Sequence, residues 1–550
     1  MSVWTSNLRL VLATVAGVLL LAALGLVFAA PAHAQGADGD FVEGELVVKI
    51  DSRSGATIEQ INAQYNTRVK ESLLENCSTC AKIYLLEITD GSTTGAKVEE
   101  MEGDQRLSYA EPNIITESPE GDKRHNARPD GTPTLSPDPV PYSNQYAVGT
   151  MNLSEAHGIS RGGGAVVAVL DTGVQFDHPE LAGSFTAARY DFADDDGVPA
   201  DEGNGADDDG DGEIDEQVGH GTHVVGIVHL TAPEAKIMPL RVLDSDGTGN
   251  VFLIAEAIQY AVRNNADVIN LSLGSRRESE LLEDVFEDLE AEDDDDDDES
   301  EALVGVPPEG VVVVGAAGND GTDAPQYPAA EEGVIGVLSV NGQEKKSEFS
   351  NYGTATESWV DVSAPGDGIH SPFPTGQYAS WSGTSMATPF VAGQAALIRG
   401  ERPTLPSTAD GGQQSVEGVI ERTARSIDAK NPDFTGKLGA GHADAGASLR
   451  ALNTAPVISA LKPQPGNKIK DRRPTVSATV RDAQTDLTKS NIRLYLDGRR
   501  KTFSYDGSRD RMTHKTGKLS FGRHSVRVVA RDAQGLVRSK VWAFKVVRRG

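Results

Sequence analysis

Apolar residues follow two different patterns along the chain, and each pattern predicts a different kind of structure. In the central part, Val166–Leu170, Ala266–Leu271 and Val311–Val314 are short runs dominated by apolar or β-branched residues. Such runs are typical of parallel strands that are buried on both faces between layers of helices. Near the C-terminus, by contrast, apolar and polar residues alternate, which predicts strands with one buried face. The chain therefore combines an α/β part with an all-β part.

The same patterns divide the chain into four regions after an N-terminal leader. Residues 41–118 predict a small α+β domain, with strands at Glu45–Ile50, Lys82–Thr89 and Leu107–Ala110 and helices at Thr57–Tyr65 and Ala96–Glu102. Residues 119–141 are rich in Pro, Gly, Asp and charged residues and predict an exposed linker. Residues 142–453 predict the α/β domain. Residues 455–549 predict a β-sandwich of the immunoglobulin-like kind, with a hairpin turn at Asp497-Gly498.

The leader has the pattern of an export signal. Arg9 precedes an uncharged apolar run, Leu10–Ala30, and Ala32-His-Ala34 is an A-x-A cleavage pattern. We expect residues 1–34 to be a signal peptide and the protein to be secreted. If the signal is not cleaved, the run is long enough to anchor the protein in a membrane. The two cysteines, Cys77 and Cys80, then predict a small disulfide rather than a metal site, which needs two more ligands.

Charge is distributed unevenly. The formal net charge of −32 argues against nucleic-acid binding. From Thr454 onward there are 23 Lys and Arg against 7 Asp and no Glu, so this region carries +16 and the rest carries −48. The stretch Arg276–Ala302, which ends in Asp293–Asp298, concentrates much of the acid, and a dense run of like charge predicts a solvated loop. The basic C-terminal domain has two possible partners, this acidic stretch or an anionic cell-surface polymer.

Four polar residues in the α/β region have the types and settings that acyl transfer by a serine hydroxyl requires. Asp171 ends a predicted strand, at the sheet edge where ligands gather in open α/β folds. His220 lies between two glycines before a predicted helix, and Ser385 opens another helix, where unpaired N–H groups favour negative charge. Asn319 follows a strand and offers an amide donor. His223, one turn beyond His220, is expected to be structural because H-G-T-H lacks the spacing of a helical metal site.

These positions fall within motifs that resemble those of the subtilisin-like serine proteases. The motifs are Val169-Leu-Asp171-Thr-Gly, His220-Gly-Thr-His-Val, Gly318-Asn319 and Gly383-Thr-Ser385-Met-Ala-Thr-Pro389. The resemblance implies that Ser385 is the nucleophile, His220 the general acid and base, Asp171 the residue that orients it, and Asn319 an oxyanion donor. It also implies a mostly parallel sheet with helices on both faces. Ser272, Leu273 and Gly274 resemble the segment that pairs with the backbone of protein or peptide substrates.

The α+β region resembles the propeptides of the same family, with Tyr109–Asn113 as their closing strand. The resemblance implies a self-processing zymogen in which the propeptide assists folding, blocks the cleft and is cut away within the linker. The competing hypothesis is a catalytically idle, protease-like protein that binds surfaces. Labelling of Ser385 by a phosphonylating reagent separates the two.

An acidic insert between Asp171 and His220 has the spacing of a calcium loop. Asp207, Asp209 and Asp211 stand at positions 1, 3 and 5 of the EF-hand pattern, followed by a turn glycine and by Asp215 at position 9. Val218 stands at position 12 in place of the bidentate acid, which excludes a full EF-hand, although Glu216 could substitute for that acid. These residues predict a structural calcium ion, with a solvated acidic loop as the alternative; the chemistry itself requires no cofactor.

Overall fold

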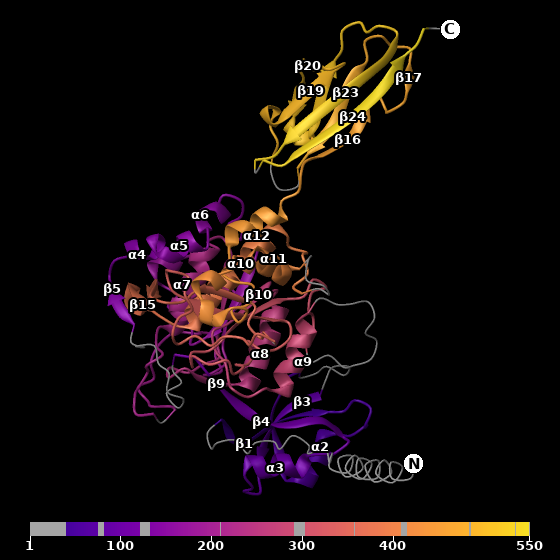
Figure 1. The fold of residues 1–550 in the computed structure, drawn as a ribbon. Helices are drawn as coiled ribbons and strands as arrows, with labels where there is room; N and C mark the ends of the chain where they lie inside the picture. Colours follow the sequence, from indigo (N-terminus) through magenta and orange to yellow (C-terminus); the bar gives the residue numbers. More distant parts are fainter. Residues whose placement is uncertain are drawn as a thin grey trace, which may run out of the picture. The chain divides into compact units, whose positions relative to one another are not determined.

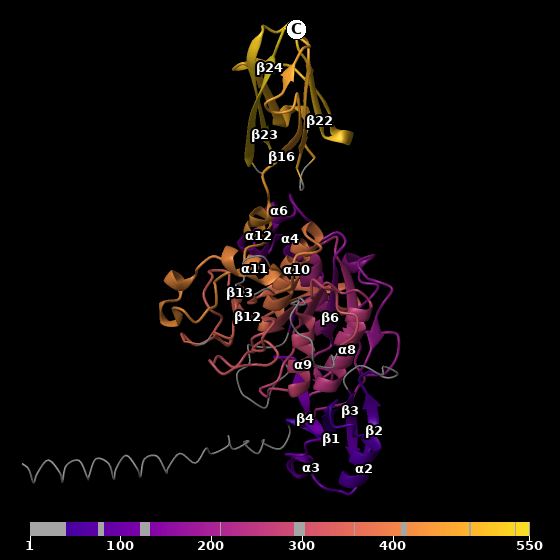
Figure 2. The same ribbon diagram turned by 90° about the vertical axis from the view of Figure 1, so that its right-hand side faces the viewer.

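The structure of the protein is a computed structural model (Figures 1 and 2). It describes residues 40–548 apart from 75–81, 121–132, 210, 291–302, 357, 409–414, 483–485 and 534. The expected signal peptide, the cysteine pair and most of the acidic run after Glu290 lie outside the described residues. Within them, no helix has the length and apolar character needed to cross a bilayer.

The N-terminal domain is the α+β fold that the sequence predicted. Its elements are β1 (Phe41–Ile50), α2 (Ile58–Tyr65), β2 (Thr67–Ser72), β3 (Lys82–Ile88), α3 (Thr94–Met101) and β4 (Leu107–Glu117). The strands form a sheet in the order β2-β3-β1-β4-β9, in which the fifth strand, β9 (Thr248–Asn250), comes from the central domain. β4 extends beyond the predicted end at Ala110, and its last residues, Ile115–Glu117, pair with β9 of the central domain.

The central domain is built on a seven-stranded sheet whose pairs are all parallel, in the order β13-β12-β11-β10-β6-β8-β7. The strands are β6 (Val166–Asp171), β7 (Tyr190–Asp191), β8 (Lys236–Arg241), β10 (Val268–Leu271), β11 (Val312–Ala316), β12 (Val334–Val340) and β13 (Val362–Pro365). Within β6, Val167 and Val169 enter one apolar layer while Ala168 and Leu170 enter the other. This two-sided burial explains why the strands lack polar alternation.

Helices cover both faces of this sheet, as predicted (Figure 1). α7 (His220–Thr231) and α10 (Thr384–Glu401) pack in one apolar layer, and α8 (Val251–Arg263) and α9 (Glu280–Leu289) pack in the other. The remaining helices of four or more residues are α4 (Val140–Asn144), α5 (Tyr146–Thr150), α6 (Leu153–Ala156), α11 (Val416–Thr423) and α12 (Ala445–Leu452). A small sheet joins β14 (Ile369–Phe373), β15 (Gln377–Trp381) and β5 (Thr134–Ser136).

The C-terminal domain is a two-sheet β structure around one apolar core, in agreement with the predicted sandwich. One sheet contains β16 (Val457–Lys462), β18 (Thr475–Arg481), β22 (Arg511–Lys515) and β21 (Ser504–Asp506). The other contains β17 (Lys468–Ile469), β24 (Val537–Val546), β23 (Gly522–Arg531), β19 (Ile492–Leu496) and β20 (Arg499–Lys501). The predicted hairpin joins β19 to β20, and Asp497 and Gly498 both have positive φ, at 51° and 76°.

Candidate active site

The structure brings Asp171 and His220 into direct contact. Asp171 is the last residue of β6 and His220 the first residue of α7, so the histidine lies inside the helix rather than before it. Asp171 Oδ1 lies 2.6 Å from His220 Nδ1, and both side chains are buried. The Thr172 backbone N–H also donates to Asp171 Oδ1, at 2.8 Å. The carboxylate is therefore fixed in a position where it orients the imidazole ring.

The glycines on either side of His220 make this approach possible. Gly219 has φ of 97°, and a Cβ atom there would lie 2.2 Å from the ring of Phe373. A Cβ atom on Gly221 would lie 2.2 Å from the Gly173 carbonyl oxygen and 3.1 Å from Asp171 Oδ1. A side chain at position 219 would clash with Phe373 of β14, and one at position 221 would push α7 away from the end of β6.

Asp201 is a second buried carboxylate, and sequence reasoning missed it. It accepts hydrogen bonds from the backbone N–H groups of Gly219 and Thr222 at the start of α7, at 2.8 and 3.0 Å. The hydroxyls of Thr172 and Thr222 also donate to it. Burial raises the pKa of Asp201, and the hydrogen bonds that it accepts lower it; burial has the larger effect, so the pKa is about 6. Asp201 thus caps the helix that carries His220 and ties it to the end of β6.

Ser385 is presented by the first turn of α10. The segment before it is fixed by Asn319, whose Oδ1 accepts from both the N–H and the hydroxyl of Thr384, each at 3.0 Å. Ser272 donates its hydroxyl to the Ser385 carbonyl oxygen at 3.0 Å, which links the end of β10 to the same turn. Ser385, Asn319 and Ser272 are all buried, and so is Leu273. The predicted nucleophile, oxyanion donor and substrate segment therefore converge.

One carboxylate, that of Glu120, contacts three of these groups at once. Glu120 Oε2 accepts a hydrogen bond from Ser385 Oγ at 2.6 Å and lies 3.1 Å from His220 Nε2. Glu120 Oε1 accepts from Asn319 Nδ2 at 2.9 Å. Nothing in the sequence around Glu120 singles it out, because its partners are 100 to 265 residues away in the chain. Its position marks a single point on which the serine, the histidine and the asparagine amide all converge.

The two carboxylates beside His220 determine the pKa of its imidazole ring. Burial alone lowers the pKa of the imidazole, but the charges and hydrogen bonds of Asp171 and Glu120 outweigh burial and raise the pKa to about 10. His220 is therefore an imidazolium at neutral pH while Glu120 is in place. The pKa of His223 is lowered to about 3, chiefly by burial. Its Nε2 lies 3.1 Å from the carbonyl oxygens of Ile369 and Ala379, which agrees with the predicted structural role.

The segment before Glu120 pairs with the central domain as an added strand. Glu117 and Gly274 exchange both backbone hydrogen bonds, each 2.9 Å long. On its other side, β4 pairs with β9 from Ile115 to Glu117, and the Ser118 N–H donates to the Gly247 carbonyl at 2.9 Å. Of the predicted substrate segment, Gly274 is the residue that makes this backbone pairing. The end of the N-terminal domain therefore fills the place expected for a substrate strand.

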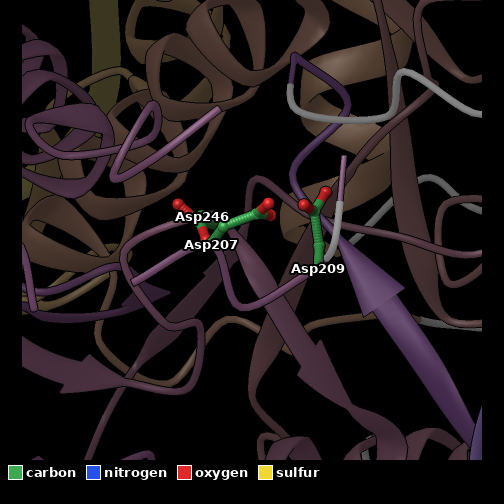
Figure 3. Close-up of side chains that lie close together, drawn as sticks. All are labelled: Asp207, Asp209 and Asp246. Carbon is green, nitrogen blue, oxygen red and sulfur yellow. The ribbon is translucent and has the colours of Figure 1, made fainter. Parts of the chain in front are cut away.

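The acidic insert brings several predicted ligands together, with one exception and one addition. Carboxylate oxygens of Asp207, Asp209 and Asp246 lie within 4.8 Å of one another (Figure 3). Those of Asp209, Asp211 and Glu216 form a second such group. Asp215 belongs to neither group. Its carboxylate instead accepts the backbone N–H groups of residues 204 and 205. Asp246, which sequence reasoning missed, comes from the loop between β8 and β9 and is buried.

Comparison with known proteins identifies the family. Residues 162–444, more than half of the chain, match the model of the Subtilase family, and residues 29–113 match that of the Fervidolysin N-terminal prodomain. The chain belongs to the subtilase family.

Curated relatives of this subtilase carry the names of proteases. Thermitase of Thermoactinomyces vulgaris is 39% identical over 300 residues, which are 53% of this chain and 91% of thermitase. A thermophilic serine proteinase of Bacillus sp. (strain AK1) is 33% identical over 408 residues, 71% of this chain and 84% of that protein. An extracellular protease of Xanthomonas campestris pv. campestris is 34% identical over 364 residues, 58% of this chain and 57% of that protein. The subtilase is a subtilisin-like serine endopeptidase with a prodomain.

Proposed function

We propose that this subtilase hydrolyses peptide bonds with Asp171, His220 and Ser385 as its catalytic triad. Ser385 Oγ attacks the substrate carbonyl while His220 Nε2 takes its proton and then passes it to the leaving amine. Asp171 keeps the proton of Nδ1 in place and stabilises the imidazolium. Asn319 Nδ2 donates to the oxyanion, and water then releases the acyl group from Ser385.

The position of the Glu120 carboxylate is the observation that carries this proposal. Its two oxygens receive the Ser385 hydroxyl and the Asn319 amide at 2.6 and 2.9 Å. Acyl transfer needs the same two groups around one carbonyl carbon: the serine oxygen, which bonds to the carbon, and the amide, which donates to the oxyanion. The backbone pairing of Glu117 with Gly274 supports Ser272, Leu273 and Gly274 as the segment that binds the substrate strand.

The proposal includes the maturation of the chain. Residues 1–34 serve as the signal peptide of a secreted protein, 41–118 as the inhibitory propeptide, 119–141 as the linker that is cut, 142–453 as the catalytic domain and 455–549 as the sandwich. Seating of the 115–118 segment in the cleft supports inhibition by the propeptide.

Expression of the wild type beside Ser385→Ala tests the proposed function. We expect N-terminal processing and casein hydrolysis in the wild type alone, because the variant lacks the nucleophile. The loss in kcat should be on the order of 10⁶-fold. A Ser385→Ala protein that still processes itself and still cleaves casein would contradict the assignment.

We further propose that the acidic insert binds a structural calcium ion through Asp207, Asp209, Asp211 and Asp246, with Glu216 beside them. The donor set consists of carboxylate oxygens, which suit a hard divalent cation. Burial, together with the charges of Asp211, Asp246 and Asp207, raises the pKa of Asp209, which shows that like charges lie close together in the cluster. Calcium would reduce the repulsion between these carboxylates and fix the insert that contains Asp201.

A basic sheet face supports attachment of the C-terminal domain to an anionic cell-surface polymer. Side chains that point outward from the five-stranded sheet include seven cations: Lys468, Arg493, Arg500, Arg523, Arg527, Arg531 and Lys545. No Asp or Glu occurs at the outward positions of these five strands in the described residues. Arg527, near the centre, lies 4.4 Å over the ring of Tyr495. A repeating polyanion matches such a face in charge.

Charge reversal on this face tests the attachment. Arg527→Glu should weaken retention of the full chain on immobilised polyphosphate, and retention should fall as salt is raised because the pairing is electrostatic. Arg509→Glu makes the same charge change in the connection between β21 and β22, outside this face, and should be retained like the wild type. Equal loss of retention in both variants would remove the assignment to this face.

A further inference from the structure

The carboxylate of Glu120 occupies the reacting centre of the uncut chain in place of a peptide bond. Its side chain is fully buried and contacts the Ser385 hydroxyl, the Asn319 amide and the His220 ring. An ionised carboxylate is a poor electrophile because its negative charge repels the attacking oxygen. While it fills this point, no peptide carbonyl can lie there.

The backbone before Glu120 explains how a side chain comes to lie at this point. Glu117 and Ser118 pair with the cleft as a substrate strand would, through Gly274 and Gly247. The next residue, Pro119, has no backbone N–H, so this hydrogen-bonded ladder cannot continue past it. The chain leaves the strand there, and the following side chain reaches into the site.

The Glu120 carboxylate fits beside Gly383 because Gly383 has no side chain. A Cβ atom at Gly383 would lie 1.6 Å from Glu120 Oε1. Gly383 therefore leaves room for an oxygen beside the Asn319 amide, where the oxyanion of a substrate would also lie.

We propose that the Glu120 side chain is a built-in inhibitor of the uncut subtilase, a carboxylate latch that holds Ser385, His220 and Asn319 together until it is withdrawn. The proposal rests on the proposed function of these three residues. Maturation then requires the latch to leave before any bond in the linker can be cut. Release of Glu120 becomes the step that limits self-processing.

The charge state of His220 belongs to the same latch. The groups that face its ring are the carboxylates of Asp171 and Glu120 and the ring of Trp381, whose centroid is 5.5 Å away at an interplanar angle of 85°. His223, one turn along α7, stays neutral because its pKa is lowered. Asp171 contributes most to the raised pKa of His220, and Glu120 raises it further, so the protonated ring does not accept the Ser385 proton while Glu120 is seated.

Reactivity of Ser385 in the uncut chain tests the latch. Full-length wild type and Glu120→Gln are treated with a fluorescent fluorophosphonate soon after folding, and uncut and mature bands are separated on a gel. The uncut Glu120→Gln band should be labelled on the order of 10- to 100-fold faster than the uncut wild-type band, the factor that a hydrogen bond to a charged group contributes.

Self-processing of Glu120→Gln should also be faster than that of the wild type. The labelling rate of the uncut wild type should rise toward pH 10, and Glu120→Gln should reach its plateau at lower pH.

Two further variants complete the comparison. Glu120→Asp keeps the charge but is one methylene shorter, and it should be labelled at a rate between the other two; it replaces Glu120→Gln if that variant does not fold. Glu99→Gln removes an exposed carboxylate from α3 in the same domain and should behave as the wild type.

The outcomes distinguish failure of the latch from failure of the proposed catalytic function. If uncut wild type and uncut Glu120→Gln are labelled at the same rate while the mature band is labelled normally, the latch is wrong and the triad stands. If no band of any variant reacts at Ser385, the proposed function itself fails.

Discussion

The Oδ1 and Nδ2 atoms of Asn319 have different roles. Its Oδ1 receives the Thr384 N–H and hydroxyl and so fixes the turn that presents Ser385. Its Nδ2 is left to donate, here to Glu120 Oε1 and in catalysis to the oxyanion. The acceptor contacts thus orient the donor, which costs no reorganisation when negative charge develops.

Replacing Asn319 should therefore lower kcat much more than it changes KM. For Asn319→Ala we expect a loss of roughly 10²–10³ in kcat, the cost of removing one oxyanion donor in this family of proteases. Steady-state kinetics of the mature enzyme on a peptide substrate measures both constants. A rise in KM with an unchanged kcat would show that Asn319 serves in binding rather than in the transition state.

At the scale of elements, the position of His220 depends on how the first turn of α7 is capped. Asp201 provides the cap from the acidic insert, and its pKa is raised to about 6 by burial. For an acid whose folded-state pKa lies above its unfolded value, the free energy of unfolding falls as pH rises through that interval. Ionisation of Asp201 thus lowers stability between pH 4 and 6.

The variant Asp201→Asn should remove this pH dependence. Both proteins carry Ser385→Ala to prevent autolysis, and their free energies of unfolding are measured in urea. Between pH 4 and 6, the free energy of unfolding should fall by about 3 kcal/mol more for the protein with Asp201 than for Asp201→Asn. Because the amide also presents an N–H₂ group to donors, the variant should unfold more readily than its parent at every pH. Parallel pH profiles for the two proteins would contradict the assignment.

The features that the sequence predicted are those whose contacts lie close together along the chain. The apolar runs Val166–Leu170 and Val311–Val314 carry their information within a few residues, so the strands of the central sheet are predictable from the sequence. Glu120 and Asp201 carry no such local signal. Each acts through partners that only the folded chain brings near, and the same holds for Asp246 beside Asp207.

For the whole molecule, the excess of negative charge means that a bound cation can stabilise the fold. The chain carries −32 overall, and its acidic insert holds a group of carboxylates at close range. The proposed calcium ion would neutralise these groups, and a ligand that binds only the folded state raises its stability. The expected rise in Tm with calcium is on the order of 5 °C for saturating ion.

Two variants distinguish calcium binding from a general effect of charge. In the Ser385→Ala background, thermal unfolding with calcium and with EDTA should show a smaller calcium-dependent rise for Asp246→Asn. Asp215→Asn removes an equal charge from a carboxylate outside the cluster and should keep the full rise, even if its Tm without calcium is lower. Identical responses in the two variants would contradict the proposed ligand set.

The central claim is that the point marked by Glu120 is the reacting centre of a serine protease whose nucleophile is Ser385. The most direct measurement treats the mature protein with a fluorophosphonate, digests it and maps the adduct by mass spectrometry. The account predicts one adduct, on Ser385, formed in proportion to the loss of casein hydrolysis. An adduct on another residue, or complete inhibition without modification of Ser385, would contradict it.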